Sequence, residues 1–443
     1  MLTNKVMEGR VRGMMLAAVV TLAASGAQAQ GLGNSPYSRI GLGEFNANTG
    51  GVRQMGMGGT GLAAPNSVNV NELNPALLYY TSRTTFEAGY MGQYKTVKNA
   101  KASSRSGSGT LGYFALSVPL ASRWAAAVGL KPLSAVDYES NILQAVAGEA
   151  GSQSLKQYKG SGGVSEAYFG QGVRITKSFT VGFTASYLFG TVDETTGTTV
   201  KIVNNTDPLT KAVDRQHTRY SDFAFRAGAH YRQKLGKALS LNAGGVYSFG
   251  HTLRGQQVNT QEREDAASSS LISEPVLLSN GRGSTYVPGL AQLALSLDND
   301  KNWSLNLDVA QQQWSKFTSF NSNSPALSNT MRVGLGGEIS PDPGSVEHYF
   351  QRVTYRAGLS VAQLPYQPGG KTLYDRAVSW GFAFPMPTAS ALESTTLSLG
   401  FTYGQRGNTD VLSSGASNVQ ESYIRGQLGV TLNNRWFIKR RLQ

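Results

Sequence analysis

The chain has 443 residues, a formal net charge of +13 at pH 7, 52 glycines and no cysteine. The absence of cysteine excludes disulfide bonds, acylation of an N-terminal cysteine, and thiol-based redox or metal chemistry. The basic balance suits anionic lipid headgroups or anionic solutes as neighbours, and a merely solvated basic surface would carry the same charge.

The first 29 residues have the three parts of a secretory signal peptide. Basic residues stand at positions 5, 10 and 12, an apolar stretch runs over residues 14–24, and small residues at 27 and 29 mark a cleavage site. The apolar stretch is shorter than the roughly 18 to 20 residues that a membrane-spanning helix needs. We therefore expect residues 1–29 to be removed after Ala29 and the remaining chain to be exported, which leaves no nucleic acid among its partners.

Residues 30–83 show almost no strand pattern. Glycines at positions 56, 58, 59 and 61 allow tight turns and close approach to a neighbouring surface. In the triplet Asn74, Pro75 and Ala76, proline fixes one backbone angle and the asparagine amide can satisfy nearby backbone groups. The triplet therefore predicts a compact turn just before the first strand.

From Thr84 onward, short segments alternate apolar and polar residues with a period of two. Over residues 179–189 the odd positions hold phenylalanine, valine, alanine and tyrosine, while positions 180, 182, 184 and 186 hold threonine, glycine and serine. Segments of about ten residues have the length that a tilted strand needs to cross a bilayer. We count fourteen of them, near residues 84–93, 109–118, 122–131, 164–174, 178–189, 219–233, 237–250, 287–298, 301–311, 329–340, 351–362, 375–385, 394–404 and 421–433.

The connections between these segments alternate between long and short. Long connections at 95–109, 131–163, 191–218 and 251–286 are followed by short ones at 121–123, 176–178, 234–236 and 299–300. Long loops on one rim and tight turns on the other are typical of an outer-membrane barrel with its turns and both termini in the periplasm. We assign no structure to the polar stretch 257–284.

These patterns predict an all-β fold, a transmembrane antiparallel β-barrel of about 14 strands over residues 84–443, in the cell outer membrane. Its surroundings would be outer-membrane lipid and lipopolysaccharide, and its long extracellular loops could dock a protein partner. Trp436 and Phe437 near the end suit an interfacial aromatic belt and a barrel-assembly signal, although the same residues could close a soluble sheet. A fourteen-strand barrel leaves an internal space, so residues 30–83 would fold into the lumen as a plug.

The sequence shows no motif for catalysis or for a cofactor. The four histidines, at positions 217, 230, 251 and 348, lack metal-ligand spacing, and neither a GxSxG elbow nor a Walker loop occurs. The stretch GMGGTG does not lie between a strand and a helix, as a nucleotide fingerprint would. We expect a protein that is not an enzyme and holds no metal or cofactor.

The polar side of the strands would carry charged residues into the lumen. Arg226, Arg332, Arg352 and Arg356 are the candidates for holding a carboxylate or phosphate headgroup through bidentate contacts. The alternative is structural, because unpaired arginine in a partly dry lumen is costly and these residues could instead fix the plug. The same parity points these further residues inward: Arg174, Asp222, His230, Asp308, Glu338 and Arg425.

The stretch RQMGMGGTGLA, followed by NPAL and then RTTFEAGY, resembles the N-terminal hatch of the FadL-type outer-membrane transporters of long-chain fatty acids and hydrophobic compounds. The resemblance implies a hatch over residues 30–83, with Asn74, Pro75 and Ala76 as its motif, followed by a fourteen-strand barrel. One departure is that Asn66 and Ser67 replace the acidic pair often found ahead of the triplet.

The resemblance also implies a function, the passive transport of hydrophobic or amphipathic, fatty-acid-like small molecules. Molecules would enter an apolar pocket and leave past a shifted hatch or through the wall, where Lys131 and Pro132 would mark either a disrupted wall or simply the end of a strand. The alternative is a closed barrel that serves as a structural or secretion-machinery partner, with a sealed lumen and no apolar pocket. A general diffusion porin is disfavoured because a filled lumen conducts poorly.

Overall fold

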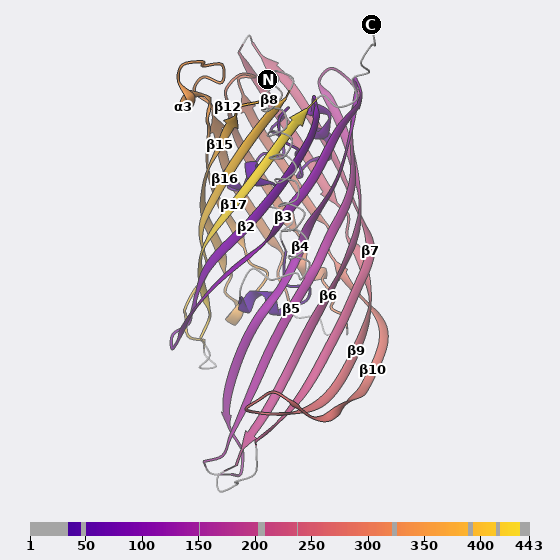
Figure 1. Ribbon diagram of the computed structural model, residues 1–443, viewed down its shortest axis with the longest axis vertical. Coiled ribbons are helices and arrows are strands. Elements are labelled where there is room, and N and C mark those ends of the chain that lie inside the picture. The colour runs from indigo at the N-terminus through magenta and orange to yellow at the C-terminus, as the bar shows by residue number, and fades with distance from the viewer. Residues whose placement is uncertain are drawn as a thin grey trace, which may run out of the picture.

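The computed structural model describes residues 34–45, 50–149, 151–202, 209–236, 238–320, 326–388, 393–412 and 417–434. They form a closed antiparallel β-barrel of fourteen strand positions, as the sequence predicts (Figure 1). The expected signal peptide and the aromatic pair at 436 and 437 lie outside these residues. Within the described part of the chain, no helix has the length and apolar character needed to cross a membrane.

Twelve of the fourteen wall positions are filled by single strands, and each of the fourteen predicted segments overlaps an observed strand. The single strands are β2 (Thr84–Lys98), β3 (Ser103–Ala121), β4 (Trp124–Ala145), β5 (Gln153–Arg174), β6 (Phe179–Lys201), β7 (Thr210–Leu235), β12 (Trp303–Gln312), β13 (Thr330–Ile339), β14 (Thr354–Gln363), β15 (Tyr374–Met386), β16 (Ser394–Gly407) and β17 (Gln420–Asn434). The barrel closes where β17 pairs with β2, from Gln420 opposite Lys98 to Asn434 opposite Thr84.

Two wall positions are each filled by two strands in line. β8 (Leu239–Ser248) and β9 (His251–Asp265) pair with the second and first halves of β7. β10 (Leu271–Val287) and β11 (Leu290–Asp298) continue the wall by pairing with β9 and β8. The stretch 257–284, to which the sequence analysis assigned no structure, therefore consists mostly of strand. The reason is that β7 continues past the ends of the shorter strands and offers an edge for pairing.

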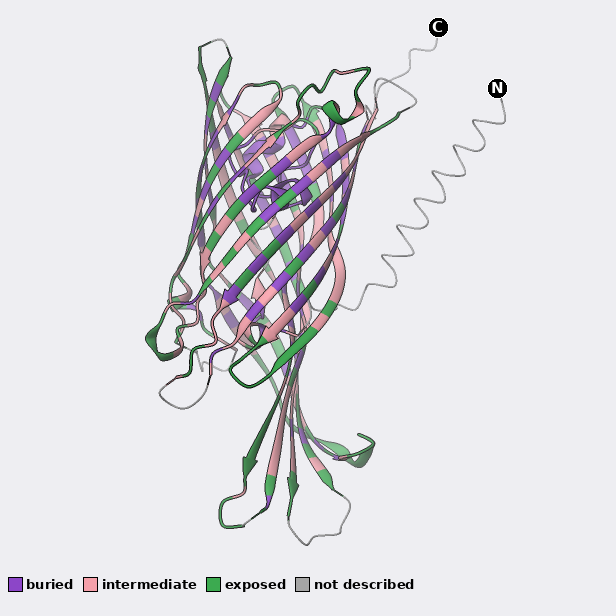
Figure 2. Cartoon of the chain, turned by 90° about the vertical axis from the view of Figure 1, so that its left-hand side faces the viewer, coloured by how far each residue is buried: buried purple, intermediate pink, exposed green. Residues whose placement is uncertain are grey.

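The period-two pattern sorts the side chains between lipid and lumen. In β6, Phe183 and Tyr187 are exposed on the outside, whereas Thr180, Thr184 and Ser186 are buried inside. Figure 2 shows the resulting bands of buried and exposed residues along the strands. The apolar side chains at alternate positions of the strands face outward, as an outer-membrane barrel requires.

Six strands reach far beyond the others at the rim that carries the long connections. β4 to β7 continue as a narrow sheet along the long axis of the barrel, and β9 and β10 extend with them and curve sideways towards their far ends (Figure 1). We call this part, residues 140–145, 153–160, 194–201, 210–216, 257–265 and 271–283, the strand extension. The predicted long loops at 131–163 and 191–218 are therefore largely β-structure.

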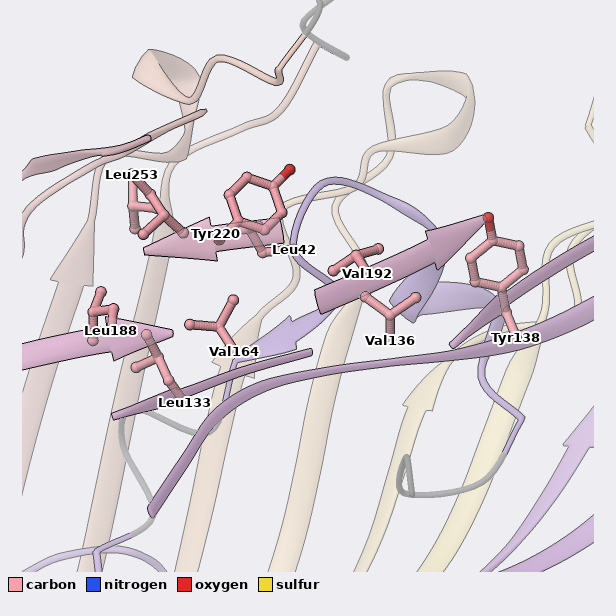
Figure 3. Packing of buried hydrophobic residues seen from close by; sticks show 10 residues of the cluster. Leu42, Leu133, Val136, Tyr138, Val164, Leu188, Val192, Tyr220 and Leu253 are labelled. Carbon is pink, nitrogen blue, oxygen red and sulfur yellow. The ribbon is translucent and has the colours of Figure 1, made fainter. Parts of the chain in front are cut away.

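The N-terminal residues lie inside the barrel. They form η1 (Pro36–Arg39), β1 (Glu44–Phe45), α2 (Val52–Gly56) and η2 (Pro75–Tyr80), while η3 (Trp314–Lys316), α3 (Tyr349–Arg352) and η4 (Pro368–Gly370) lie in connections between strands. Leu42 packs into an apolar cluster with side chains of β4 to β7 and β9, including Leu133, Leu188 and Leu253 (Figure 3). A second cluster joins Val52 and Leu78 to the inner wall.

Candidate functional site

The turn at Asn74 joins two parts of the N-terminal segment to the wall. The Asn74 side-chain carbonyl accepts the Ala76 N–H (3.0 Å), which caps η2. Its amide donates to the carbonyl oxygens of Leu62 (3.1 Å) and Ala229 (3.2 Å). Asn74 is fully buried, and Ala229 lies on β7, so one side chain holds the turn against the barrel.

Small residues on the inner wall let the N-terminal segment come close. A Cβ added at Gly182 of β6 would lie 2.6 Å from the Pro75 carbonyl oxygen, and one added at Gly358 of β14 would lie 2.5 Å from the Gly58 nitrogen. Both distances are shorter than real Cβ contacts, so larger residues would displace the segment. The N-terminal segment is therefore packed directly onto the backbone of the wall.

A buried ion triad ties α2 to β13 and β14. Glu338 accepts hydrogen bonds from Arg53 (2.6 Å) and from Arg356 (3.0 Å), and all three side chains are nearly inaccessible to solvent. Removing one partner from such a buried group typically costs about 3–5 kcal/mol, because a charge is left uncompensated. Arg356, predicted to point into the lumen, does so and binds an acid there.

Two other predicted lumenal arginines also contact the N-terminal segment. Arg226 donates to the Glu72 carbonyl oxygen (3.0 Å) and lies 3.8 Å from the Glu166 carboxylate. Arg332 donates to the carbonyl oxygens of Gly58 and Gly59. Asp308 accepts the N–H groups of Gly61 and Leu62, both at 3.0 Å. These contacts favour the structural alternative for Arg226 and Arg356, which are already held by carboxylates.

The prediction for Arg352 is wrong in its position. Residues 349–352 form α3 in the turn between β13 and β14, and β14 begins only at Thr354. The Arg352 guanidinium lies over the Tyr349 ring, 5.1 Å from its centroid, at the rim of the short turns. The segment predicted as the start of a strand is instead a helical turn, so Arg352 does not lie on β14.

A second buried charge cluster was missed by the sequence analysis. Glu44 of β1 lies 3.0 Å from Arg406 and 3.9 Å from Lys95, and Glu421 lies 3.3 Å and 3.9 Å from the same two cations. The Ser35 hydroxyl donates to Glu421 (2.6 Å). We call these residues the Glu44 cluster. Lys95 and Arg406 were overlooked because β2 and β16 extend past their predicted ends, which had left both residues in loops.

The Glu44 cluster governs the ionisation of Glu44. Burial disfavours the carboxylate, but Arg406 and Lys95 outweigh it and hold the pKa of Glu44 at about 2, below its ordinary value of 4.5. Glu44 is therefore charged at neutral pH. It pins the segment 34–45 to β2 and β16, while the hydrogen bond from Ser35 to Glu421 holds the segment to β17.

A cavity of about 270 Å³ lies between the N-terminal segment and the inner wall of β12 to β17. Its apolar lining residues include Ile40, Leu42, Phe45, Trp314 and Phe317. Arg332 and Arg425 also line it; Arg425 donates to Gln93 (2.9 Å), and neither guanidinium has a carboxylate within 4.0 Å among the described residues. One part of the lining is thus apolar, and another carries charged groups of both signs: Arg332 and Arg425, which form no ion pair within 4.0 Å among the described residues, together with Glu44, Asp375 and Arg406.

Comparison with known proteins places the chain in a family. The model of the BamG family matches residues 11–443. The chain belongs to the BamG family. No curated protein matches its sequence.

Among solved structures, this BamG-family chain resembles a FadL homologue from Pseudomonas aeruginosa (TM-score 0.58, 12% identity, covering 90% of this chain and 100% of that one). It also resembles the monoaromatic hydrocarbon channel CymD (TM-score 0.54, 16% identity, 88% and 99%) and the toluene transporter TbuX of Ralstonia pickettii (TM-score 0.53, 15% identity, 88% and 99%). At these identities the likeness shows a shared FadL-type barrel fold.

The BamG-family barrel has an interrupted wall at Lys131 and Pro132. Pairing between β3 and β4 stops at Phe114 opposite Leu130, while β4 itself continues to Ala145. Pro132 therefore does not end its strand, as one reading of the sequence had it; it lies where β4 parts from β3. Beyond that point β4 pairs with β5 on its other edge.

In the BamG-family barrel, residues 34–45 occupy the edge of β4 that β3 leaves free. Glu44 and Phe45 pair with Ala135 and Ser134. The Asp137 carbonyl oxygen accepts the Ser35 N–H (2.8 Å). The wall interruption is thus lined by a segment of the same chain, which could expose the β4 edge if it moved.

Within the described part of the BamG-family chain, no group of three or more histidine and acidic residues is arranged to hold a metal ion. The cavity can hold an apolar body beside Trp314 and Phe317 and an anion beside Arg332 and Arg425.

Proposed function

We propose that this barrel is a passive outer-membrane transporter of hydrophobic or amphipathic small molecules with fatty-acid-like shape. The cavity of about 270 Å³ carries the proposal, because it joins an apolar lining to two guanidinium groups that form no ion pair within 4.0 Å among the described residues. Such a pairing suits a ligand with an apolar body and an anionic head. Proteins named as hydrocarbon channels and toluene transporters share the fold, which supports the proposal.

In this proposal three of the four arginines predicted from the sequence divide between two roles. Arg332, together with Arg425, binds the headgroup. Arg226 and Arg356 hold the plug through Glu166 and Glu338. Arg352 takes part in neither role.

The domain assignment belongs to the same proposal. Residues 1–29 serve as the signal peptide, residues 30–83 as the hatch with Asn74, Pro75 and Ala76 as its final turn, and residues 84–443 as the barrel. The ligand enters from the rim of the strand extension, reaches the cavity, and leaves when residues 34–45 move from the β4 edge or when the hatch shifts.

Ligand binding tests the proposal directly. A fluorescent long-chain fatty acid and the matching uncharged alcohol are titrated into the purified barrel. We expect both to bind, and the variant Arg332→Gln/Arg425→Gln to weaken the acid about tenfold or more while leaving the alcohol nearly unchanged, because only the acid has a charged head.

Arg356→Gln is the matched control, since it removes a buried arginine that already has a carboxylate partner. It should lower the temperature at which the barrel unfolds more than it changes the preference for acid over alcohol. The transport proposal is wrong if neither probe binds the wild-type protein in the cavity.

The second candidate function is a closed barrel that serves as a structural or secretion-machinery partner. It is favoured by the plug itself, which is locked by the buried Glu338 triad and by close contact at Gly182 and Gly358. In that case purified barrels should bind neither probe, and outer-membrane vesicles with and without the protein should take up both probes equally.

A further inference from the structure

The strand extension ends in a free strand edge. β10 pairs with β9 from Leu271 to Val287. On its other edge, the described part of the chain supplies only the single bridge from Tyr286 to Thr318. Most of one side of β10 therefore presents backbone N–H and C=O groups without a neighbouring strand, the kind of edge that readily pairs with another chain.

The same strand is exposed on both of its faces. All twelve residues from Leu271 to Arg282 are exposed, so both side-chain parities face solvent. Five of them are large and apolar, each 54–61% exposed: Leu271, Ile272, Val276, Leu277 and Leu278. Isolated proteins rarely leave a contiguous apolar ribbon of this kind uncovered.

Lipid does not cover β10. The strands β12, β13 and β14 have ten residues each, the length that spans a bilayer at the usual tilt. β10 and β11 fill one wall position in line. β11 forms the membrane-spanning part of that position, and β10 forms the part in the strand extension. Its apolar side chains consequently lie in the aqueous layer above the membrane.

The charge on β10 argues against an anionic glycolipid as the occupant. Between Leu271 and Val287 the charged residues are one acid, Glu274, and one base, Arg282, so the ribbon offers no basic patch. A row of backbone groups is matched by another peptide backbone, as in other cases of strand addition. The opposite charges at the two ends would set the register of a peptide with complementary charges.

A second copy of this chain does not fit the same edge. Antiparallel pairing of two identical edges needs a two-fold axis perpendicular to the sheet. The sheet of the strand extension runs along the long axis of the barrel (Figures 1 and 2). The two-fold axis, perpendicular to this sheet, would therefore lie in the membrane plane. The second barrel would then be upside down, which two copies in one membrane cannot satisfy.

We infer that the free edge of β10, from Val276 to Ser284, docks an extended segment of a different protein outside the membrane, which joins the strand extension as a further β-strand. The segment carries apolar side chains opposite Val276 and Leu278, a basic residue near Glu274 and an acidic residue near Arg282. This inference does not depend on transport through the lumen.

Hydrogen exchange in two states of the full-length protein tests the inference. We expect the amides of residues 276–284 to exchange about tenfold or more slowly in native outer-membrane vesicles than in the purified barrel in detergent, since strand pairing protects backbone N–H groups. Val276→Lys/Leu278→Lys should abolish the difference. Equal exchange in vesicles and in detergent would overturn the inference.

Gln261→Lys is the matched control, because Gln261 is exposed and lies opposite Val276 on the paired β9 side. It should retain the protection. Both variants should keep wild-type heat-modifiable migration and wild-type binding of the fluorescent fatty acid, because β10 lies beyond the barrel. A loss of fatty-acid binding alone would count against the transport proposal and not against docking.

Cross-linking identifies the occupant, and the native absence of cysteine makes a single introduced thiol specific. Leu278→Cys, labelled on intact cells with a thiol-reactive photo-cross-linker, should yield one adduct whose second chain is a different protein. Adding Glu274→Lys/Arg282→Glu should lower the yield of this adduct. Ser268→Cys at the hairpin tip should not yield it. An adduct of twice the mass of this chain, or one with lipopolysaccharide, would contradict the inference.

Discussion

At the scale of single residues, Asn74 shows how much one side chain can organise. It satisfies one N–H and two carbonyl groups, and one of these groups lies 155 residues away from Asn74 in the chain. Leaving a buried polar group without its partner costs about 1–3 kcal/mol. Asn74 is therefore expected to matter more to the plug than its place in an ordinary turn would suggest.

We predict that Asn74→Leu loosens the plug while the strands still form. The change removes three hydrogen bonds and adds bulk against Gly228, so the plug should lose about 3 kcal/mol or more of stability. The barrel should stay heat-modifiable and membrane-inserted, with altered single-channel conductance or uptake of hydrophobic compounds.

The control for this prediction is Asn99→Leu. Asn99 also caps a turn, through the N–H groups of Lys101 and Ala102, but in an exposed connection. It should leave conductance and uptake unchanged. Wild-type values for both measurements in Asn74→Leu would mean that the turn has no gating role.

At the scale of elements, the segment 34–45 differs from the rest of the plug in how it is held. Its backbone pairs with the edge of β4, and its carboxylate at Glu44 forms ion pairs with Arg406 and Lys95. The Asn74 turn and the Glu338 triad hold residues beyond 50 instead. The two parts can therefore respond to different conditions.

We predict that acid releases segment 34–45 first. The pKa of Glu44 is lowered from 4.5 to about 2 by Arg406 and Lys95, although burial opposes the shift. The stability that it contributes is fully present above pH 4.5 and is lost as the pH falls from 4.5 towards 2. Hydrogen exchange, corrected for intrinsic rates, should show residues 34–45 losing protection in that window while β12 to β14 keep theirs.

Glu44→Gln should remove most of this pH dependence, because glutamine cannot titrate. Its segment should already exchange faster at pH 6, since Arg406 and Lys95 lose a counter-charge. Unchanged protection of residues 34–45 in the wild-type protein between pH 6 and pH 2 would rule out this role for Glu44.

At the scale of the whole molecule, the two rims of the barrel are unlike. Turns such as those after β7 and β11 are short, whereas six strands build the extension at the opposite rim. An outer-membrane barrel places its short turns in the periplasm. This asymmetry predicts which parts of the chain face the outside of the cell.

We predict that peptide tags inserted near Ser104 or Asp265 are labelled by antibody on intact cells, and that tags near Gly236 or Asn299 are labelled only after the outer membrane is permeabilised. The first two sites lie at the extension rim and the last two in short turns. Labelling of the short turns alone on intact cells would invert the orientation.

Much of the wall was predictable because the membrane imposes a simple pattern. Lipid on one side and a polar lumen on the other force alternation, so strands such as β6 and β12 can be found from their period of two. β10 could not, because both of its faces meet water and alternation has no cause there. The ends of β2 and β16 were missed as well, and with them Lys95 and Arg406, although both side chains are buried there.

The sequence alone determined the fourteen-strand barrel, because period, segment length and turn residues are local properties. Only the tertiary structure decided which inward groups meet. Arg53 finds Glu338 285 residues away, and Glu44 meets Arg406 and Lys95 only after β17 closes on β2. Barrel closure sets these distances, and no local pattern in the chain records them.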